Sequence, residues 1–328
     1  MNFVSLKVLH SKTLLKNCFF SFLNFDIKFY RQVHKGRPNI FLAKRCCKST
    51  LFPRSRCYQH LPNSFFSTVS YLGAAEMANK SSEGLALKHV LSKLHAFASP
   101  ALAESWDNVG LLVEPVTPRP ISNILLTNDL TEAVMQEALE LSTDLIISYH
   151  PPIFVPLKSL TTKTWKERLI ATCLENRVAL YSPHTSWDVV KDGIPVAGHG
   201  TGRLCVLKKP ISILEAVDRV KKHISIPYVR LALASNKDQD SLITTVALCP
   251  GSGTSVLKGV KADLWLTGEM FHHDVLDAVH KGTHVILCNH SDSERGFLTS
   301  FADTLTKLLD DKVCVRLSLS DCDPLKTV

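Results

Sequence analysis

The feature that most constrains this chain is an internal repeat of strand, turn, helix and strand. Residues 124–150 combine an apolar strand, a turn, an amphipathic helix and a second apolar strand that begins at Asp144-Leu145. Residues 246–269 follow the same order, and Asp263-Leu264 begins their second strand. Alternating strands and helices are typical of α/β proteins. The repeat therefore predicts duplicated α/β halves related by a pseudo-twofold axis.

The third apolar strand of each repeat ends at a histidine, His184 in the first and His290 in the second. A carboxylate follows four residues later in both cases, Asp188 and Glu294. Residues just past the carboxyl ends of parallel strands line a crevice at one edge of a sheet. We expect two such crevices to face each other and to bring the two histidine–carboxylate pairs together.

Aligning Asp144 with Asp263 also sets His150 opposite Glu269. Histidine and carboxylate ligands together suit two divalent ions of the Zn, Mn, Fe or Co type. Satisfaction of these polar groups by the backbone is the alternative, and their recurrence within a repeat favours a metal site. The predicted ligands are His150, His184, Asp188, His290 and Glu294.

Charge separates the start of the chain from the rest. Residues 1–75 carry twelve Lys/Arg and one acid, Asp26, whereas the remainder carries 26 basic and 29 acidic residues. The net charge of +8 therefore belongs to the leader, and the mildly acidic body argues against direct nucleic-acid binding. We divide the chain into a leader (1–80), a first half (81–200) and a second half (201–328).

The leader has the composition of a mitochondrial transit peptide, because it is basic, rich in Ser and Phe and nearly free of acids. Its apolar run at 18–25 is too short to span a membrane. A disordered extension is the alternative, and a start at Met77 would give a cytoplasmic and nuclear product. The ten cysteines form no C-x-x-C pair, which is typical of reduced thiols inside a cell.

Several further side chains could belong to a functional site or have a purely structural role. Trp187 could stack on a base or pack in the core, and the turn at 250–253 could bind phosphate or only reverse the chain. Of His272 and His273, one is expected to be exposed, because adjacent helical residues point apart. The loop residues Asp107 and Asp129 are expected at the same edge as the metal site, where they could line a pocket or cap turns.

Six stretches, in order over residues 85–325, resemble the Nif-three-like family, also called domain of unknown function 34. They are SWDNVGLLVEP (105–115), TNDLTEAV (127–134), DLIISYHPPIF (144–154), NRVALYSPHTSWD (176–188), GSGTSVLKGVKADLWLTGE (251–269) and VILCNHSDSERG (285–296). The resemblance implies duplicated α/β halves, a dinuclear metal site on the five residues named above, and assembly as dimers or toroidal hexamers. Bacterial members often carry a GTP cyclohydrolase-like label, and the yeast-derived name refers to an interaction with a transcriptional regulator.

The sequence departs from the family pattern at two places. Tyr149 stands where many bacterial members have a first of two adjacent histidines, and a phenol is a poorer ligand than imidazole. Larger members also insert a separate domain after the Asp188 segment, whereas only a few residues separate Asp188 from Gly202 here. The large middle domain, and the helix that usually follows Asp188, are therefore expected to be absent.

Two functions follow from these expectations. A two-metal centre suits hydrolysis of a phosphoester or of a nucleotide- or pterin-like ring, with Glu269 as the candidate for proton transfer. The alternative role for Glu269 is a purely structural one. The alternative function is a non-catalytic protein that binds transcription regulators and in which the metals are structural.

Overall fold

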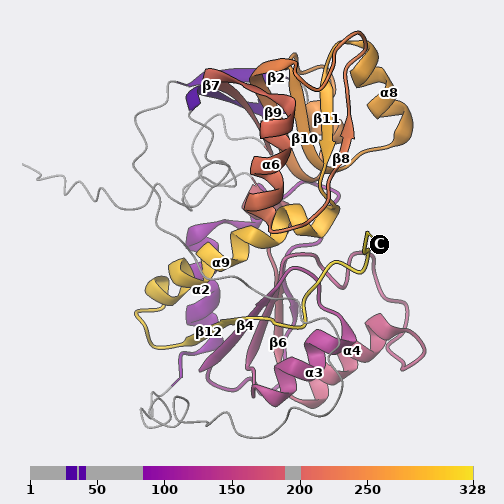
Figure 1. Cartoon of the computed structure of the whole chain (residues 1–328). Coiled ribbons are helices and arrows are strands. Elements are labelled where there is room, and N and C mark those ends of the chain that lie inside the picture. Colours follow the sequence, from indigo (N-terminus) through magenta and orange to yellow (C-terminus); the bar gives the residue numbers. More distant parts are fainter. Residues whose placement is uncertain (1–26, 35–36, 42–83, 189–200, 328) are drawn as a thin grey trace, which may run out of the picture.

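The computed structural model describes residues 27–34, 37–41, 84–188 and 201–327, which are built around two β-sheets (Figure 1). The five-stranded sheet has the order β12-β4-β5-β6-β3. Its strands are β3 (Gly110–Val113), β4 (Asn123–Thr127), β5 (Leu145–Ser148), β6 (Ala179–Ser182) and β12 (Cys314–Leu317). β5 and β6 are buried along their whole length, as expected for central parallel strands covered on both faces.

The second sheet has seven strands in the order β2-β1-β7-β9-β10-β11-β8. They are β1 (Ile27–His34), β2 (Arg37–Phe41), β7 (Gly202–Ser212), β8 (Arg230–Ala232), β9 (Leu242–Ser252), β10 (Leu264–Glu269) and β11 (His284–Leu287). Each repeat supplies three parallel strands, β4-β5-β6 and β9-β10-β11, with an antiparallel strand beyond the last, β3 on β6 and β8 on β11. β12 adds a fourth parallel strand to the first sheet. The predicted duplicated α/β fold is confirmed.

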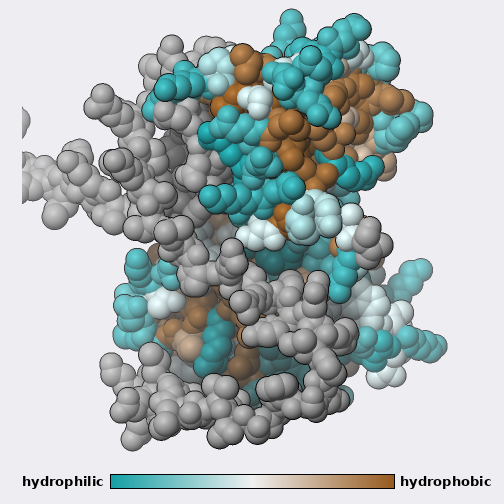
Figure 2. Space-filling view, viewed as in Figure 1, coloured by the Kyte–Doolittle hydropathy of each residue, from teal (hydrophilic) through white to brown (hydrophobic). Residues whose placement is uncertain are grey.

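Helices cover both sheets and follow the repeat. They are α2 (Leu87–Phe97), the short η1 (Pro100–Leu102), α3 (Glu132–Glu140), α4 (Trp165–Glu175), α5 (Thr185–Asp188), α6 (Ile213–Ile224), α7 (Thr254–Leu257), α8 (His272–His280) and α9 (His290–Leu308). At the start of α6, the Ser212 hydroxyl accepts a hydrogen bond from the Glu215 backbone N–H and so caps the helix. α6 buries Ile213, Ala216 and Val220, and Figure 2 shows mostly hydrophilic side chains where its outer face lies.

Two aspartates hold the repeats together in the same way. The Asp144 carboxylate accepts hydrogen bonds from the backbone N–H groups of Ser122 (2.9 Å) and Asn123 (3.0 Å). The Asp263 carboxylate accepts from the N–H groups of Thr244 (2.8 Å) and Thr245 (2.9 Å). Each aspartate, placed just before its own strand, therefore anchors the start of the preceding parallel strand.

The strand registers refine the match between the halves. Leu145 pairs with Ala179 and Leu264 pairs with His284, so His184 corresponds in the backbone to Asn289 rather than to His290. His184 and Asn289 both have a positive φ, 37° and 63°. The alignment of the two histidines by sequence is therefore one residue out of register, because the ligand in the second half belongs to the helix that follows the turn.

α9 joins the halves. It contacts β4 and β12 of one sheet and β9 and β10 of the other, and Figure 1 shows it between the two sheets beside α2. In its buried face, Leu298, Phe301 and Leu305 pack in one cluster with the buried residues of α2. Each half has its own hydrophobic core, and the shared helix α9 joins the two halves.

Strands from two parts of the chain pair with a half to which the predicted domain division does not assign them. β1 and β2 lie within the predicted leader, yet β1 pairs antiparallel with β7 and covers an edge that would otherwise expose unpaired backbone groups. An unstructured leader does not describe these two segments, and the rest of residues 1–80 lies outside the described residues. β12, from the end of the chain, pairs with β4 in the sheet of the first half. The boundary at residues 200 and 201 stays a prediction.

Candidate metal centre

His150 lies just past the end of β5, as the sequence predicted, and both of its ring nitrogens face carboxylates. Its Nδ1 is 2.8 Å from Asp129 Oδ1, and its Nε2 is 3.3 Å from Glu294 Oε2. The backbone N–H of His150 donates to the Asn128 carbonyl oxygen (3.0 Å), which fixes the turn that carries the ring. His150 is thus held between the first and the second half.

His290 and Glu294 lie one turn apart at the start of α9. The His290 Nε2 is 3.4 Å from Glu294 Oε1, and its Nδ1 is 2.9 Å from Glu269 Oε1. The ligand atoms of His150, His290 and Glu294 all lie within 4.8 Å of one another, close enough to bind one ion. The two oxygens of Glu294 therefore face one histidine from each half.

His184 completes the group of three histidines. Its Nδ1 is 2.7 Å from Asp107 Oδ1, and the other oxygen of Asp107 accepts hydrogen bonds from the backbone N–H and the hydroxyl of Thr185. The His184 ring centroid lies 5.4 Å from that of His150, which is in turn 5.2 Å from that of His290. His150 is therefore a neighbour of both other rings, whereas the group of described residues whose ligand atoms could bind one ion contains neither His184 nor Asp188.

One arrangement recurs at all three histidines, in which Nδ1 pairs with a carboxylate. Asp107, Asp129 and Glu269 are the respective partners. Histidines that bind metals through Nε2 usually have their second ring nitrogen held in this way, which fixes the ring and the tautomer. The structure thus gives Asp107 and Asp129, predicted only as loop residues at this edge, a definite role. Glu269, the candidate for proton transfer, contacts an imidazole.

Asp188 differs from the other predicted ligands because its partner is a phenol. The Tyr149 hydroxyl donates a hydrogen bond to Asp188 Oδ1 (2.5 Å). Burial raises the pKa of Asp188 to about 6, against the lowering effect of the Tyr149 hydrogen bond, and Glu294 adds to the increase. Burial also raises the pKa of Tyr149 well above its ordinary value, and the neighbouring carboxylates reinforce this. Tyr149 is therefore a protonated donor to Asp188.

The negative charge of Glu294 controls the two histidines beside it. Its hydrogen bond and charge raise the pKa of His290 to about 9 against the effect of burial, and Glu269 contributes further. Burial disfavours the charged form of His150, but Asp129 and Glu294 outweigh it and raise the pKa. Metal binding at these nitrogens must therefore displace protons.

The end of β9, where Gly251 lies, is directly against these ligands. Gly251 has a φ of +63°, and a Cβ added there would overlap the Glu294 carboxylate and approach His290 Nε2. The Gly251 N–H donates to Ser293 Oγ (2.8 Å), and the Gly253 N–H donates to Thr267 Oγ1 (3.0 Å). These amides are satisfied within the protein, which favours the tight-turn interpretation over phosphate binding.

The other candidates lie outside the centre. Trp187 is 5% exposed, and its ring centroid is 4.2 Å from that of Phe301, so it belongs to the core. His272 and His273 are both exposed at the start of α8, although only one of them was expected to be. The side chains of neither approach the three-histidine group through any described contact.

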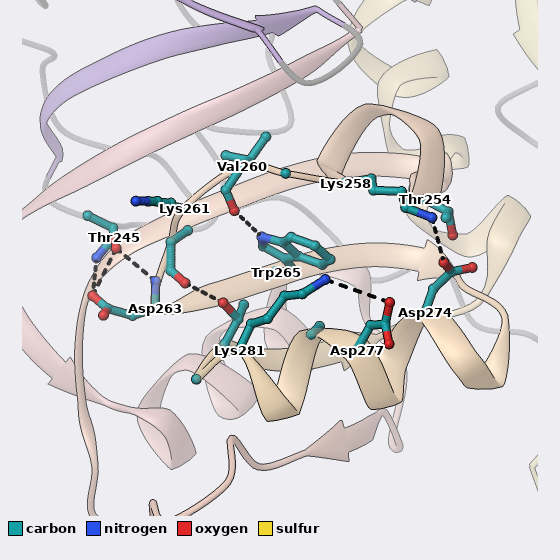
Figure 3. A pocket seen from close by; sticks show the side chains of 15 residues that line it. Thr245, Thr254, Lys258, Val260, Lys261, Asp263, Trp265, Asp274, Asp277 and Lys281 are labelled. Carbon is teal, nitrogen blue, oxygen red and sulfur yellow. Dashed lines mark hydrogen bonds and ion pairs between the residues drawn. The ribbon is translucent and has the colours of Figure 1, made fainter.

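A separate hollow lies between α8 and the neighbouring loop over Trp265 (Figure 3). Two ion pairs border the hollow, Lys258 with Asp274 and Lys281 with Asp277, both at 3.6 Å. None of the three histidines or their carboxylates lines it. The hollow therefore has no connection with the metal centre.

Comparison with known proteins gives the same family that the sequence motifs resemble. The family model described as Duf34/NIF3 (NGG1p interacting factor 3) matches residues 85–324. A NIF3-like protein 1 of Drosophila melanogaster is 47% identical over 75% of this chain and 90% of its own length. The Saccharomyces cerevisiae protein NGG1-interacting factor 3 is 36% identical over 68% and 90%.

A solved structure shares the fold at lower identity. The Bacillus cereus protein related to NIF3 is 18% identical, with a TM-score of 0.65 over 74% of this chain and 98% of that one. None of the described helices is long and apolar enough to cross a membrane.

Proposed function

The chain belongs to the Duf34/NIF3 family, and we propose that it is a metal-dependent hydrolase with two divalent ions held by His150, His184, Asp188, His290 and Glu294. The observation that carries the proposal is the set of three histidines whose Nδ1 atoms are each held by a carboxylate. Their Nε2 atoms, with the two oxygens of Glu294, supply a donor set that suits Zn, Mn, Fe or Co. The Gly251 turn leaves room for Glu294 to sit between two histidines.

A bound pair of such ions supplies Lewis acidity and lowers the pKa of coordinated water. The residues of the chain then position and support the reaction. Asp107 and Asp129 hold His184 and His150 in fixed orientations, and Tyr149 keeps a proton on its oxygen beside Asp188. Glu269, with a side chain 57% exposed, orients His290 and is also positioned to exchange a proton with solvent.

The accessibility of the centre favours catalysis over a structural role. Side-chain exposure rises from 0% at Asp107 to 34% at Asp129, 35% at His290 and 57% at Glu269, so the centre opens to solvent beside Asp129, His290 and Glu269. Structural metal sites are closed by protein ligands, whereas catalytic sites keep an open position. A site that opens in this way can admit a phosphoester or a nucleotide-like substrate.

The test is to measure metal per chain by mass spectrometry on the full chain and on the His184→Ala and His290→Ala variants. Phosphatase and phosphodiesterase activity is then measured with each loaded ion. We expect two ions in the wild type, fewer in each variant and metal-dependent turnover. Full metal retention in both variants would exclude these ligands, and full loading without turnover on any ester would exclude the hydrolase.

A second candidate function is a regulatory interaction. The yeast relative carries the name NGG1-interacting factor 3, which describes binding to a regulator. We infer that, if this function applies, metal removal changes partner capture while ester hydrolysis is absent. Affinity capture from cells with loaded and chelated protein measures this.

Assembly and location complete the proposal. We propose a homo-oligomer, either a dimer or a hexamer, to be measured by sedimentation of the full chain. We also propose that the basic leader directs the protein to mitochondria, with a cytoplasmic and nuclear pool if Met77 starts translation. Imaging of a C-terminally tagged chain with and without residues 1–76 distinguishes these locations.

A further inference from the structure

Two exposed aromatic rings lie beside His184. Trp106 is 58% exposed and Phe154 is 43% exposed, although they come from loops about 50 residues apart. Their ring centroids are 6.1 Å apart. We call this pair the aromatic wall. Large aromatic side chains provide much of the apolar area buried in binding sites, and two exposed rings in contact form an apolar surface that a planar ligand can cover.

The aromatic wall adjoins the metal centre. The His184 ring lies edge-on to both members, with a centroid 6.0 Å from Trp106 at 79° and 6.4 Å from Phe154 at 80°. Trp106 directly precedes Asp107, the carboxylate that holds His184 Nδ1. A molecule that stacks on the wall therefore lies next to a predicted metal ligand.

The wall is held in place before any ligand binds. The Asn108 side-chain amide donates to the Ile153 carbonyl oxygen, which ties the loop of Trp106 to the loop of Phe154. The Thr185 hydroxyl accepts from the Glu104 backbone N–H (3.1 Å) and anchors the same loop to α5. A rigid aromatic surface loses little conformational entropy on binding a planar ring.

From this geometry we propose that the aromatic wall is the subsite for a planar aromatic ring of the substrate, such as a nucleobase or an aryl group. The proposal rests on the proposed hydrolase function and names its substrate class, an ester that carries such a ring. Every aromatic ring has a π-face, so stacking on Trp106 selects planarity and tolerates different ring chemistries. The stacking role that the sequence analysis considered for Trp187, which is buried, is thus assigned to the aromatic wall.

The test is calorimetric titration of the metal-loaded full chain with 1-naphthyl phosphate, adenosine 5′-monophosphate and ribose 5-phosphate. The first two carry a ring and the third does not. We expect both ring-bearing esters to bind about tenfold more tightly than ribose 5-phosphate, and Trp106→Ala to remove that difference. Trp106→Phe should retain most of it.

Trp165→Ala is the matched control, because Trp165 is 43% exposed at the start of α4 and contacts Lys166. It should leave all three affinities unchanged. Equal affinity of wild type for the three esters, or an unchanged preference in Trp106→Ala, would overturn the proposal. A shift of Trp106→Ala to a smaller oligomer would also overturn it, because a second copy would then cover the wall.

Metal content separates failure of this inference from failure of the proposed function. Trp106→Ala should keep the wild-type metal content, since Trp106 holds no predicted ligand by a hydrogen bond. Ring-dependent binding without turnover supports the aromatic subsite and contradicts the hydrolase. Turnover of ring-bearing and ring-free esters with equal efficiency contradicts the subsite and leaves the hydrolase standing.

Discussion

The two halves of the molecule share a backbone plan but support their metal ligands differently. In the second half, His290 and Glu294 lie on α9, a helix of 19 residues packed between the sheets. In the first half, His184 directly precedes α5 and Asp188 is the last residue of α5, directly before residues 189–200, which lie outside the described residues. Duplicated strands therefore fix where the ligands arise, while the helices that carry the ligands differ between the halves.

The carboxylate ligands of the two halves also differ in the groups that surround them. Glu294 faces two histidines and the glycine of a neighbouring turn, whereas the hydrogen bond of Asp188 comes from the Tyr149 hydroxyl. Glu294 is thus shared between the halves, with one histidine of each half beside its carboxylate. Asp188 instead lies in surroundings that favour its protonated form. We therefore expect the ion nearer α9 to bind more tightly than the ion nearer α5.

The largest expected effect is the loss of metal in Glu294→Gln. The amide removes the charge that faces His150 and His290, so we expect both ions to be lost. Asp188→Asn is the matched variant of the first half and should lose only the weaker ion. Metal per chain, measured by inductively coupled plasma mass spectrometry, gives both values. Equal losses in the two variants would contradict the difference between the halves.

The loss of metal affinity on removing a carboxylate that holds a histidine should increase with the burial of that carboxylate. Asp107 has a side chain with 0% exposure and Glu269 one with 57%. Loss of such a partner typically lowers metal affinity about 10- to 100-fold. We expect Asp107→Asn to lie near the upper end of that range and Glu269→Gln near the lower end, because solvent replaces the lost contact at Glu269. Competition with a chelator measures the affinities, and a reversed order would contradict the ranking.

The same comparison shows what the sequence could and could not predict. Periodicity located the strands and helices of both halves, and the polar strand ends led to His150, His290 and Glu294, which the structure brings together. These features depend on local spacing, which a sequence displays directly. The return of β12 to the first sheet does not, because it depends on a pairing between segments about 190 residues apart.

Partnerships across the fold were missed for a similar reason. Asp107 holds a histidine 77 residues away, and nothing in its own loop indicates which ring it contacts. The exposure of Trp106 was equally invisible, since a tryptophan in a loop is compatible with core packing. A useful signal was present in the sequence: Asp107 and Asp129 lie in loops that border the centre, and Glu269 lies at the end of β10.

A smaller effect is expected on the stability of the metal-free protein. The pKa of Asp188 is about 6 in the fold and near 4 in an unfolded chain, so the folded state binds the proton more tightly. Stability should therefore fall as pH rises from 4 to 6, by about 2–3 kcal/mol, and Asp188→Asn should remove this slope. Urea unfolding in a chelator at pH 4.5 and 7 measures it. A wild-type slope that persists in the variant would exclude Asp188 as its source.

The smallest expected effects concern the two strand anchors, Asp144 and Asp263. Asp263 accepts hydrogen bonds from the N–H and hydroxyl groups of both Thr244 and Thr245, whereas Asp144 accepts two backbone N–H groups and pairs with Arg119. We expect each alanine variant to lower the free energy of unfolding by about 1–2 kcal/mol, with Asp263→Ala the larger. Urea unfolding at pH 7 compares them.

The pH dependence of the Asp263 variant then tests the cause. Burial opposes ionisation, but the hydrogen bonds from Thr244 and Thr245 outweigh it and lower the pKa of Asp263. A carboxyl whose pKa is lowered by folding stabilises the protein above its unfolded pKa, and that contribution is lost as pH falls through the folded pKa. The difference between wild type and Asp263→Ala should therefore be constant from pH 5 to 8 and narrow below about pH 4. A gap that does not narrow in acid would mean that side-chain packing, and not the charge at the start of the strand, anchors the second repeat.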